Sequence, residues 1–118
     1  MSNFHACTVA VTGASGSLGR ALLQALAQQG ASLVALTSSS APLLLQDPAG
    51  TAIPLEQVCW HCGQEQELRE LLERVDILIL NHGINQQQLR SPSATALALE
   101  VNALSSWRLL ELFAEVVQ

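Results

Sequence analysis

Apolar residues along this chain follow two spacings, which predict two kinds of secondary structure. Short runs of mainly apolar residues predict four β-strands, at 7–12, 31–37, 56–61 and 76–80. Elsewhere apolar residues recur about every 3.6 positions, which predicts helices at 17–29, 64–75 and 93–117. The segment 38–54 contains Pro42, Pro48, Gly50 and Pro54, so it is expected to be a loop with at most one helical turn.

The predicted strands and helices alternate, and this alternation favours a parallel sheet with right-handed crossovers. The strand at 76–80 is continuously apolar after Asp76, which is typical of a parallel strand covered on both faces. The carboxyl ends of parallel strands meet at one edge of the sheet. We therefore expect four segments to converge on a single crevice there: 13–19, 37–39, 61–63 and 81–83.

The helix predicted at 64–75 has an apolar face and an acidic face. Its apolar residues are expected to point inward: Leu68, Leu71, Leu72 and Val75. Its acidic residues are expected to point outward: Glu65, Glu67, Glu70 and Glu73. Glu70 and Arg74 are four residues apart, which predicts a favourable ion pair on the helix surface. For the last helix, Ser91 or Ser93 is the expected N-cap.

The turn between the first strand and the first helix has the sequence Thr-Gly-Ala-Ser-Gly-Ser-Leu-Gly, residues 12–19. Its glycines, Gly13, Gly16 and Gly19, are three residues apart, unlike the G-x-G-x-x-G dinucleotide fingerprint. A P-loop is excluded because no Gly-Lys-Ser/Thr follows, and the chain has no lysine. A helix N-terminus presents unpaired amides to an anion, so this turn is a candidate diphosphate site. The alternative is an ordinary glycine-rich turn that holds no ligand.

This turn resembles that of the short-chain dehydrogenase/reductase family, in its T-G-x-x-G-x-x-G form. Two further segments resemble family motifs: 81–83, Asn-His-Gly, is similar to N-A-G, and Val101-Asn102 is similar to V-N. The resemblance covers essentially the whole chain. It implies a single domain over 1–118, a three-layer Rossmann-like α/β fold whose parallel strands lie in the order 3-2-1-4. It also implies that the C-terminal half of the family fold is lacking.

The resemblance also implies roles for individual residues. Contacts to the pyrophosphate are expected from Gly13, Ser15, Gly16, Ser17, Leu18 and Gly19. Thr37 and Ser38 would face the adenosine ribose, and His61 with Cys62 would flank the adenine. The central crevice would be lined by Asn81, His82 and Gly83. Asn102 would be a supporting member of the catalytic set.

Two of these positions leave alternatives open. Residues 37–40, Thr-Ser-Ser-Ser, stand where a site for NAD usually has an acidic residue. Hydroxyls can bind a 2′-phosphate, so NADP is favoured over NAD, although a serine-rich loop without such a role has the same sequence. His82 replaces the alanine of N-A-G, and it is either a proton carrier or a polar side chain at the rim.

The C-x-x-C at Cys59-Trp60-His61-Cys62 is disfavoured as a redox or zinc site. A redox pair of this kind begins a helix, whereas Cys59 lies in a predicted strand, where residues three apart point to opposite faces. His82 follows the fourth strand, which the first two strands separate from the third. We therefore expect no metal ligand set that combines His82 with these cysteines.

The composition excludes several kinds of partner. A net charge of −5 argues against nucleic acid and anionic membranes, and no run of eighteen apolar residues predicts a membrane span. Three cysteines form no even disulfide framework, which favours a reducing compartment such as the cytoplasm. The helix at 93–117 is apolar nearly all round, and the strand at 76–80 is an apolar edge. We therefore expect a homodimer through this helix or this edge.

The sequence contains no tyrosine and no lysine. The family's hydride transfer uses a tyrosine as acid/base and a lysine that lowers the tyrosine pKa, in the motif Y-x-x-x-K. The resemblance therefore implies the NAD(P)-binding portion of an oxidoreductase, inactive in this form. The alternative is a non-catalytic module that binds a dinucleotide for sensing or assembly.

Overall fold

The computed structural model describes residues 4–83 and 92–117 and contains one four-stranded parallel sheet. Its strands are β1 (Thr8–Thr12), β2 (Ser32–Thr37), β3 (Glu56–Cys59) and β4 (Ile77–Ile79). Their order is β3-β2-β1-β4, and every pairing is parallel. The predicted strand order is confirmed, although the observed strands are one or two residues shorter at their ends than the sequence pattern predicts.

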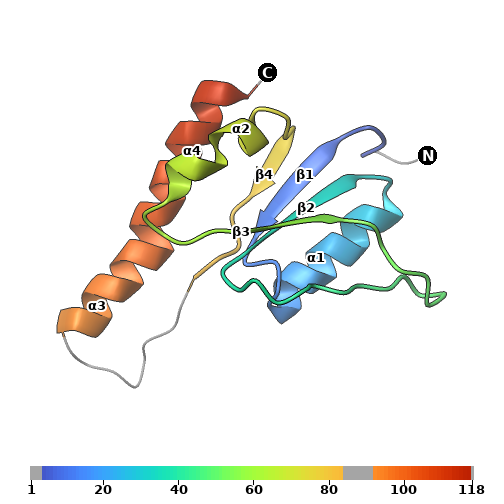
Figure 1. Ribbon diagram of the computed structural model, residues 1–118, viewed down its shortest axis with the longest axis horizontal. Helices are drawn as coiled ribbons and strands as arrows, with labels where there is room; N and C mark the ends of the chain where they lie inside the picture. Colours follow the sequence, from blue (N-terminus) through green and yellow to red (C-terminus); the bar gives the residue numbers. More distant parts are fainter. Residues whose placement is uncertain (1–3, 84–91, 118) are drawn as a thin grey trace.

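Helices cover both faces of this sheet (Figure 1). Helix α1 (Ser17–Gln28) packs on one face, where Leu23 and Leu26 meet Val9 and Val11 of β1. Ala10, between these two valines, points to the opposite face, because successive strand residues alternate between faces. That face is covered by α2 (Arg69–Leu72) and α4 (Ser105–Val116). The three-layer arrangement expected from the sequence is therefore present.

The connection from β2 to β3 contains no helix among its described residues, as predicted. Leu43 and Leu45 point inward from it and join the core on the α1 side of the sheet. A short antiparallel bridge pairs Gln46 with Ala52. Two buried leucines thus replace the apolar face that a crossover helix would supply.

The prediction of one continuous helix at 64–75 is wrong in part. A 3₁₀ turn, η1 (Glu65–Leu68), precedes the single turn of α2. The inward residues are as expected, but Glu65 is buried rather than exposed, because its carboxylate meets Arg108 of α4. Arg74 does not pair with Glu70. Its guanidinium instead makes two hydrogen bonds to Glu56 of β3, at 2.6 and 2.8 Å.

The last helix is longer than α4 and contains a change of helical pitch. It runs through α3 (Pro92–Leu99), a π-helical segment η2 (Glu100–Leu104) and α4. The sequence predicts the helix but not its π segment. Ser91, one of the two expected caps, lies outside the described residues, and Ser93 lies inside the helix. None of the described helices is long and apolar enough to span a membrane.

Candidate nucleotide-binding site

A crevice of about 600 Å³ lies at the carboxyl edge of the sheet, a size typical of small-molecule sites. The four segments expected to converge there do so, and Trp60 and Val101 join them. Every residue proposed from the sequence to contact the cofactor lines this crevice, with the exception of Thr37. They are Gly13, Ser15, Gly16, Ser17, Leu18, Gly19, Ser38, His61, Cys62, Asn81, His82 and Gly83.

Two glycines of the turn after β1 are required by close backbone packing. Gly13 has a φ of +61°, and a Cβ there would lie 2.5 Å from the carbonyl oxygen of Asn81. A Cβ on Gly19 would lie 2.3 Å from the carbonyl oxygen of Gly13. Neither position has room for a side chain, so these glycines let β1, β4 and α1 approach one another.

Gly16 differs because a Cβ there would meet only one neighbouring atom, the Gly13 carbonyl oxygen at 3.6 Å. Gly16 is the N-cap of α1, and no side chain caps this helix end or places an acid in its first turn. The first-turn amides therefore face the crevice without a side-chain acceptor among the described residues. An uncapped helix end behind a bare glycine suits a phosphate, whose oxygens accept hydrogen bonds from amides.

The end of β2 places its two candidate residues differently. Ser38 lines the crevice, whereas Thr37 is buried and its hydroxyl donates to the carbonyl oxygen of Ser39 at 2.7 Å. The side-chain amide of Gln57 also donates to the Thr37 hydroxyl, at 3.3 Å. Thr37 thus shapes the turn, and Ser38 is the one of these two residues that lines the crevice.

His82 is more enclosed than a rim side chain. Its Nδ1 lies 2.8 Å from the Thr12 hydroxyl and its Nε2 lies 3.4 Å from the Ser106 hydroxyl. The ring also meets Trp60 edge to face, with centroids 5.4 Å apart. Burial lowers the pKa of His82, and this effect is opposed by the charge of Glu65 and by a hydrogen bond with the Val101 backbone.

The contact between Trp60 and His82 is not expected from the strand order, because β2 and β1 separate the strands that precede these residues. It brings together the loops that follow β3 and β4, and both residues line the same crevice. The side chain of Cys59 contacts the Ser38 carbonyl oxygen at 3.6 Å. No three His, Cys, Asp or Glu side chains within 4–83 and 92–117 are arranged to hold a metal ion.

Asn102 lies on the π-helical segment, beside Gly83. A Cβ on Gly83 would lie 3.0 Å from Oδ1 of Asn102, so the absence of a side chain lets the two segments approach. Val101, which precedes Asn102, lines the crevice. The V-N segment thus reaches the central crevice through its valine, and Asn102 packs against the loop after β4.

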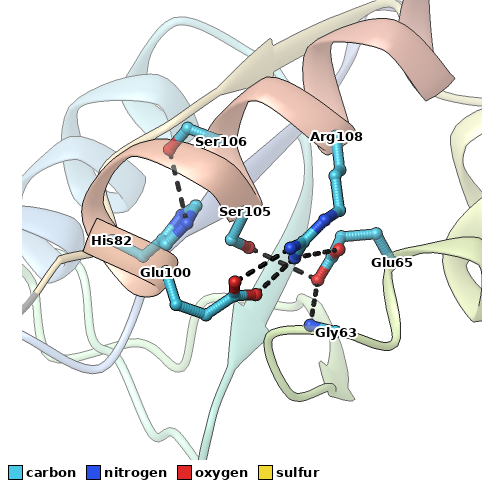
Figure 2. Close-up of polar contacts among 7 residues, drawn as sticks. All are labelled: Gly63, Glu65, His82, Glu100, Ser105, Ser106 and Arg108. Carbon is cyan, nitrogen blue, oxygen red and sulfur yellow. Dashed lines mark hydrogen bonds and ion pairs between the residues drawn. The ribbon is translucent and has the colours of Figure 1, made fainter. Parts of the chain in front are cut away.

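A charged group next to the crevice was not predicted as part of the site (Figure 2). Glu65 is only 2 % exposed, and its carboxylate accepts hydrogen bonds from the Gly63 amide and from Arg108. Arg108 also forms a bidentate pair with Glu100, which lowers the pKa of Glu100 and raises that of Arg108. The sequence offers one signal for this group: Arg108 is the only basic residue of the apolar segment 93–117.

This sheet order and the crevice at its carboxyl edge define a Rossmann-type α/β domain. The model of the NAD dependent epimerase/dehydratase family matches residues 9–117, and the chain belongs to that family. A monoglucosyldiacylglycerol epimerase from Synechocystis sp. is 46% identical over 110 residues, which cover 93% of this chain and 27% of that protein. The chain therefore spans about a quarter of the length of this curated relative.

Solved structures confirm the short-chain dehydrogenase/reductase fold. A short-chain dehydrogenase/reductase from Serratia marcescens matches with a TM-score of 0.73 and 18% identity, covering 98% of this chain and 52% of that one. A short-chain dehydrogenase/reductase from Brucella melitensis matches with a TM-score of 0.77 and 17% identity, covering 99% of this chain and 54% of that one. A short-chain dehydrogenase/reductase superfamily protein from Agrobacterium tumefaciens, solved with bound NAD, matches with a TM-score of 0.69 and 24% identity, covering 94% of this chain and 30% of that one. These similarities establish the fold.

Proposed function

We propose that this chain is the NAD(P)-binding portion of an epimerase or related oxidoreductase of the short-chain dehydrogenase/reductase type. The observation that carries the proposal is the bare turn at Gly16, which opens the uncapped end of α1 onto the crevice. The chemistry that a bound nicotinamide supplies is reversible hydride transfer. Membership of the NAD dependent epimerase/dehydratase family supports this assignment.

In this proposal the phosphates rest on the turn 13–19 and the adenosine lies toward the end of β2. Ser38 would contact the ribose, while His61 and Cys62 would flank the adenine. His82 and Gly83 would lie at the floor of the crevice, toward the nicotinamide. The lining of one crevice by all four loops supports these positions.

NADP is the proposed cofactor in preference to NAD. Ser38 lines the crevice, and the described residues 37–40 include no carboxylate that would repel a 2′-phosphate. Calorimetric titration with NADP and NAD tests the whole assignment, and tighter binding of NADP is the expected result. Ser38→Asp should weaken NADP by about tenfold or more and spare NAD, whereas a wild-type chain that binds neither nucleotide would overturn the proposed function.

The relative in Synechocystis, whose name describes epimerisation of a glucosyl lipid, supports a proposal for the substrate class. We propose a glycosylated substrate for the complete catalytic unit. The chain contains no tyrosine and no lysine, so by itself it should bind nucleotide without turning over substrate. The second candidate, a non-catalytic nucleotide-binding module, rests on the same absence. A Y-x-x-x-K motif downstream in the same reading frame would exclude it.

A homodimer formed through the last helix is part of the proposal. Large apolar side chains of this helix are exposed: Leu97, Leu99, Leu104, Trp107 and Leu110. Trp107, which is 62% exposed, is the best residue to test. Sedimentation should show a dimer that Trp107→Glu converts to monomer, and a monomeric wild-type chain would contradict this part. The three cysteines are unpaired, which supports a reducing compartment such as the cytoplasm.

A further inference from the structure

We infer that Glu65, Arg108 and Glu100, hereafter the arginine cluster, position two walls of the nucleotide crevice relative to each other. One wall is the loop 60–63 after β3, and the other is the π-helical segment η2. This inference rests on the proposed function, because it concerns the same crevice. It assigns a role to charged residues that lie beside the crevice and do not line it.

The cluster begins with a buried carboxylate. Glu65 is 2 % exposed, and burying a charge is costly unless the charge is paired and hydrogen-bonded. Arg108 supplies the pairing charge at 3.1 Å, and the Ser105 hydroxyl contributes a hydrogen bond at 3.4 Å. The Gly63 amide donates to Oε2 of Glu65, the same oxygen that accepts from Ser105, while Arg108 binds Oε1. The carboxylate therefore joins the loop after β3 to α4, and Glu65 and Arg108 are 43 residues apart in sequence.

The second half of the cluster explains the position of the π-helical segment. Glu100 and Arg108 are eight residues apart, whereas two α-helical turns take about 7.2 residues. A π turn adds about one residue, so it brings both side chains onto the same face of the helix. Arg108 then binds both carboxylate oxygens of Glu100 and still reaches Glu65 (Figure 2). The bidentate pair thus holds the helix in its π geometry.

Both ends of the cluster adjoin residues that line the crevice. His61 and Cys62 immediately precede Gly63, and Val101 immediately follows Glu100. Release of the Gly63 amide would free one wall, and relaxation of the π turn would rotate Val101 away from the other. The Glu65 charge also acts on His82, which lines the same crevice. A nucleotide would then have to order both walls as it binds, at a cost in affinity.

A matched control exists in the ion pair between Arg69 and Glu115. It also joins the α2 region to α4, at 2.9 Å, but both side chains are well exposed, at 46% and 64%. Such a pair contributes little to stability, and neither residue lines the crevice. Arg69→Met therefore removes one arginine and one ion pair between α2 and α4, next to the cluster, without touching the proposed positioning contacts.

The test compares Arg108→Met and Glu100→Gln with Arg69→Met in the 118-residue chain, by calorimetric titration with NADP and by amide hydrogen exchange. Arg108→Met and Glu100→Gln should weaken NADP binding about tenfold, while Arg69→Met binds as the wild type. Exchange should accelerate at Gly63 and at 100–104 in Arg108→Met, and at 100–104 in Glu100→Gln, with the sheet amides unchanged. Arg108→Lys keeps the positive charge without the bidentate contact, so its NADP affinity should lie between those of the wild type and Arg108→Met.

Unchanged NADP affinity in both cluster variants would overturn the inference, as would faster exchange spread evenly over the whole chain. Glu100→Gln preserves the shape of the side chain and the Glu65–Arg108 pair, so it decides the matter if Arg108→Met does not fold. If the wild type binds no nucleotide, the proposed function fails while the exchange pattern still reports on the two walls. Accelerated exchange confined to Gly63 and 100–104 would then support the cluster's role, and unchanged exchange there would refute it.

Discussion

Adding one methyl group at Gly16 or at Gly19 should separate nucleotide binding from stability. At Gly16 the new Cβ meets only the Gly13 carbonyl oxygen, at 3.6 Å, and the φ of −75° suits alanine. At Gly19 the new Cβ would lie 2.3 Å from that oxygen and 2.8 Å from Cα of Ala14. Both neighbours are backbone atoms, so Gly19→Ala forces the turn and α1 apart.

The magnitudes follow from these contacts. In Gly19→Ala, alanine gains about 1 kcal/mol from helix propensity, but the clash costs about 3 kcal/mol because backbone must move. The net loss of unfolding free energy is about 2 kcal/mol. In Gly16→Ala, the lower entropy of the unfolded chain gains about 0.5 kcal/mol, and the poorer N-cap residue costs a similar amount. Its net effect should stay within about 0.5 kcal/mol.

Urea denaturation and calorimetric titration with NADP measure the two effects separately. With a denaturant slope of about 2 kcal/mol/M, Gly19→Ala should lower the urea midpoint by about 1 M. Gly16→Ala should unfold at nearly the wild-type midpoint. Its NADP affinity should fall by about tenfold or more, because the methyl group occupies the space through which a phosphate reaches the amides.

Either variant can refute this reasoning. Wild-type NADP affinity in Gly16→Ala would show that the phosphates do not rest on this turn. A wild-type urea midpoint in Gly19→Ala would show that the close approach of α1 to the turn does not constrain the fold. Equal losses of stability in both variants would show that the two glycines do not differ as their surroundings indicate.

Three further predictions concern titration, a surface ion pair and the core. Burial lowers the pKa of folded His82 below its unfolded value of about 6.5, so its contribution to stability should be full above that pH and fall as the pH drops toward the folded pKa. Urea midpoints measured from pH 7.5 to 5 test this, and His82→Gln should lose this part of the pH dependence. Arg74→Met breaks the exposed ion pair with Glu56 and should lower the unfolding free energy by less than about 1 kcal/mol. A larger loss, measured by thermal unfolding, would contradict the view that this surface pair contributes little to stability. Leu72→Ala opens a cavity at a fully buried position and should cost about 2–5 kcal/mol; a loss below 1 kcal/mol in denaturant would show that the site collapses.

The amino-acid sequence determined the sheet and the crevice because both depend on local patterns. Strand length, helical periodicity and the proline-rich segment predict which elements form, and their alternation predicts a parallel sheet. The resemblance to the short-chain dehydrogenase/reductase family then implies the order β3-β2-β1-β4, which is observed. The glycine spacing at 13–19 predicts the turn, since only glycine fits backbone approaches as close as those at Gly13 and Gly19. Twelve of the thirteen residues expected to contact the cofactor consequently line one crevice.

The tertiary structure decided which charged and polar side chains meet. Helical periodicity placed Glu65 on the solvent side, but a 3₁₀ turn directs it to Arg108, 43 residues further along the chain. The contact of Trp60 with His82 likewise depends on the packing of two segments that follow different strands. A residue's own neighbours in sequence encode its tendency to be buried. The partner of a buried charge is set only when distant segments are packed together, because the charge binds whichever opposite charge the packing brings within reach.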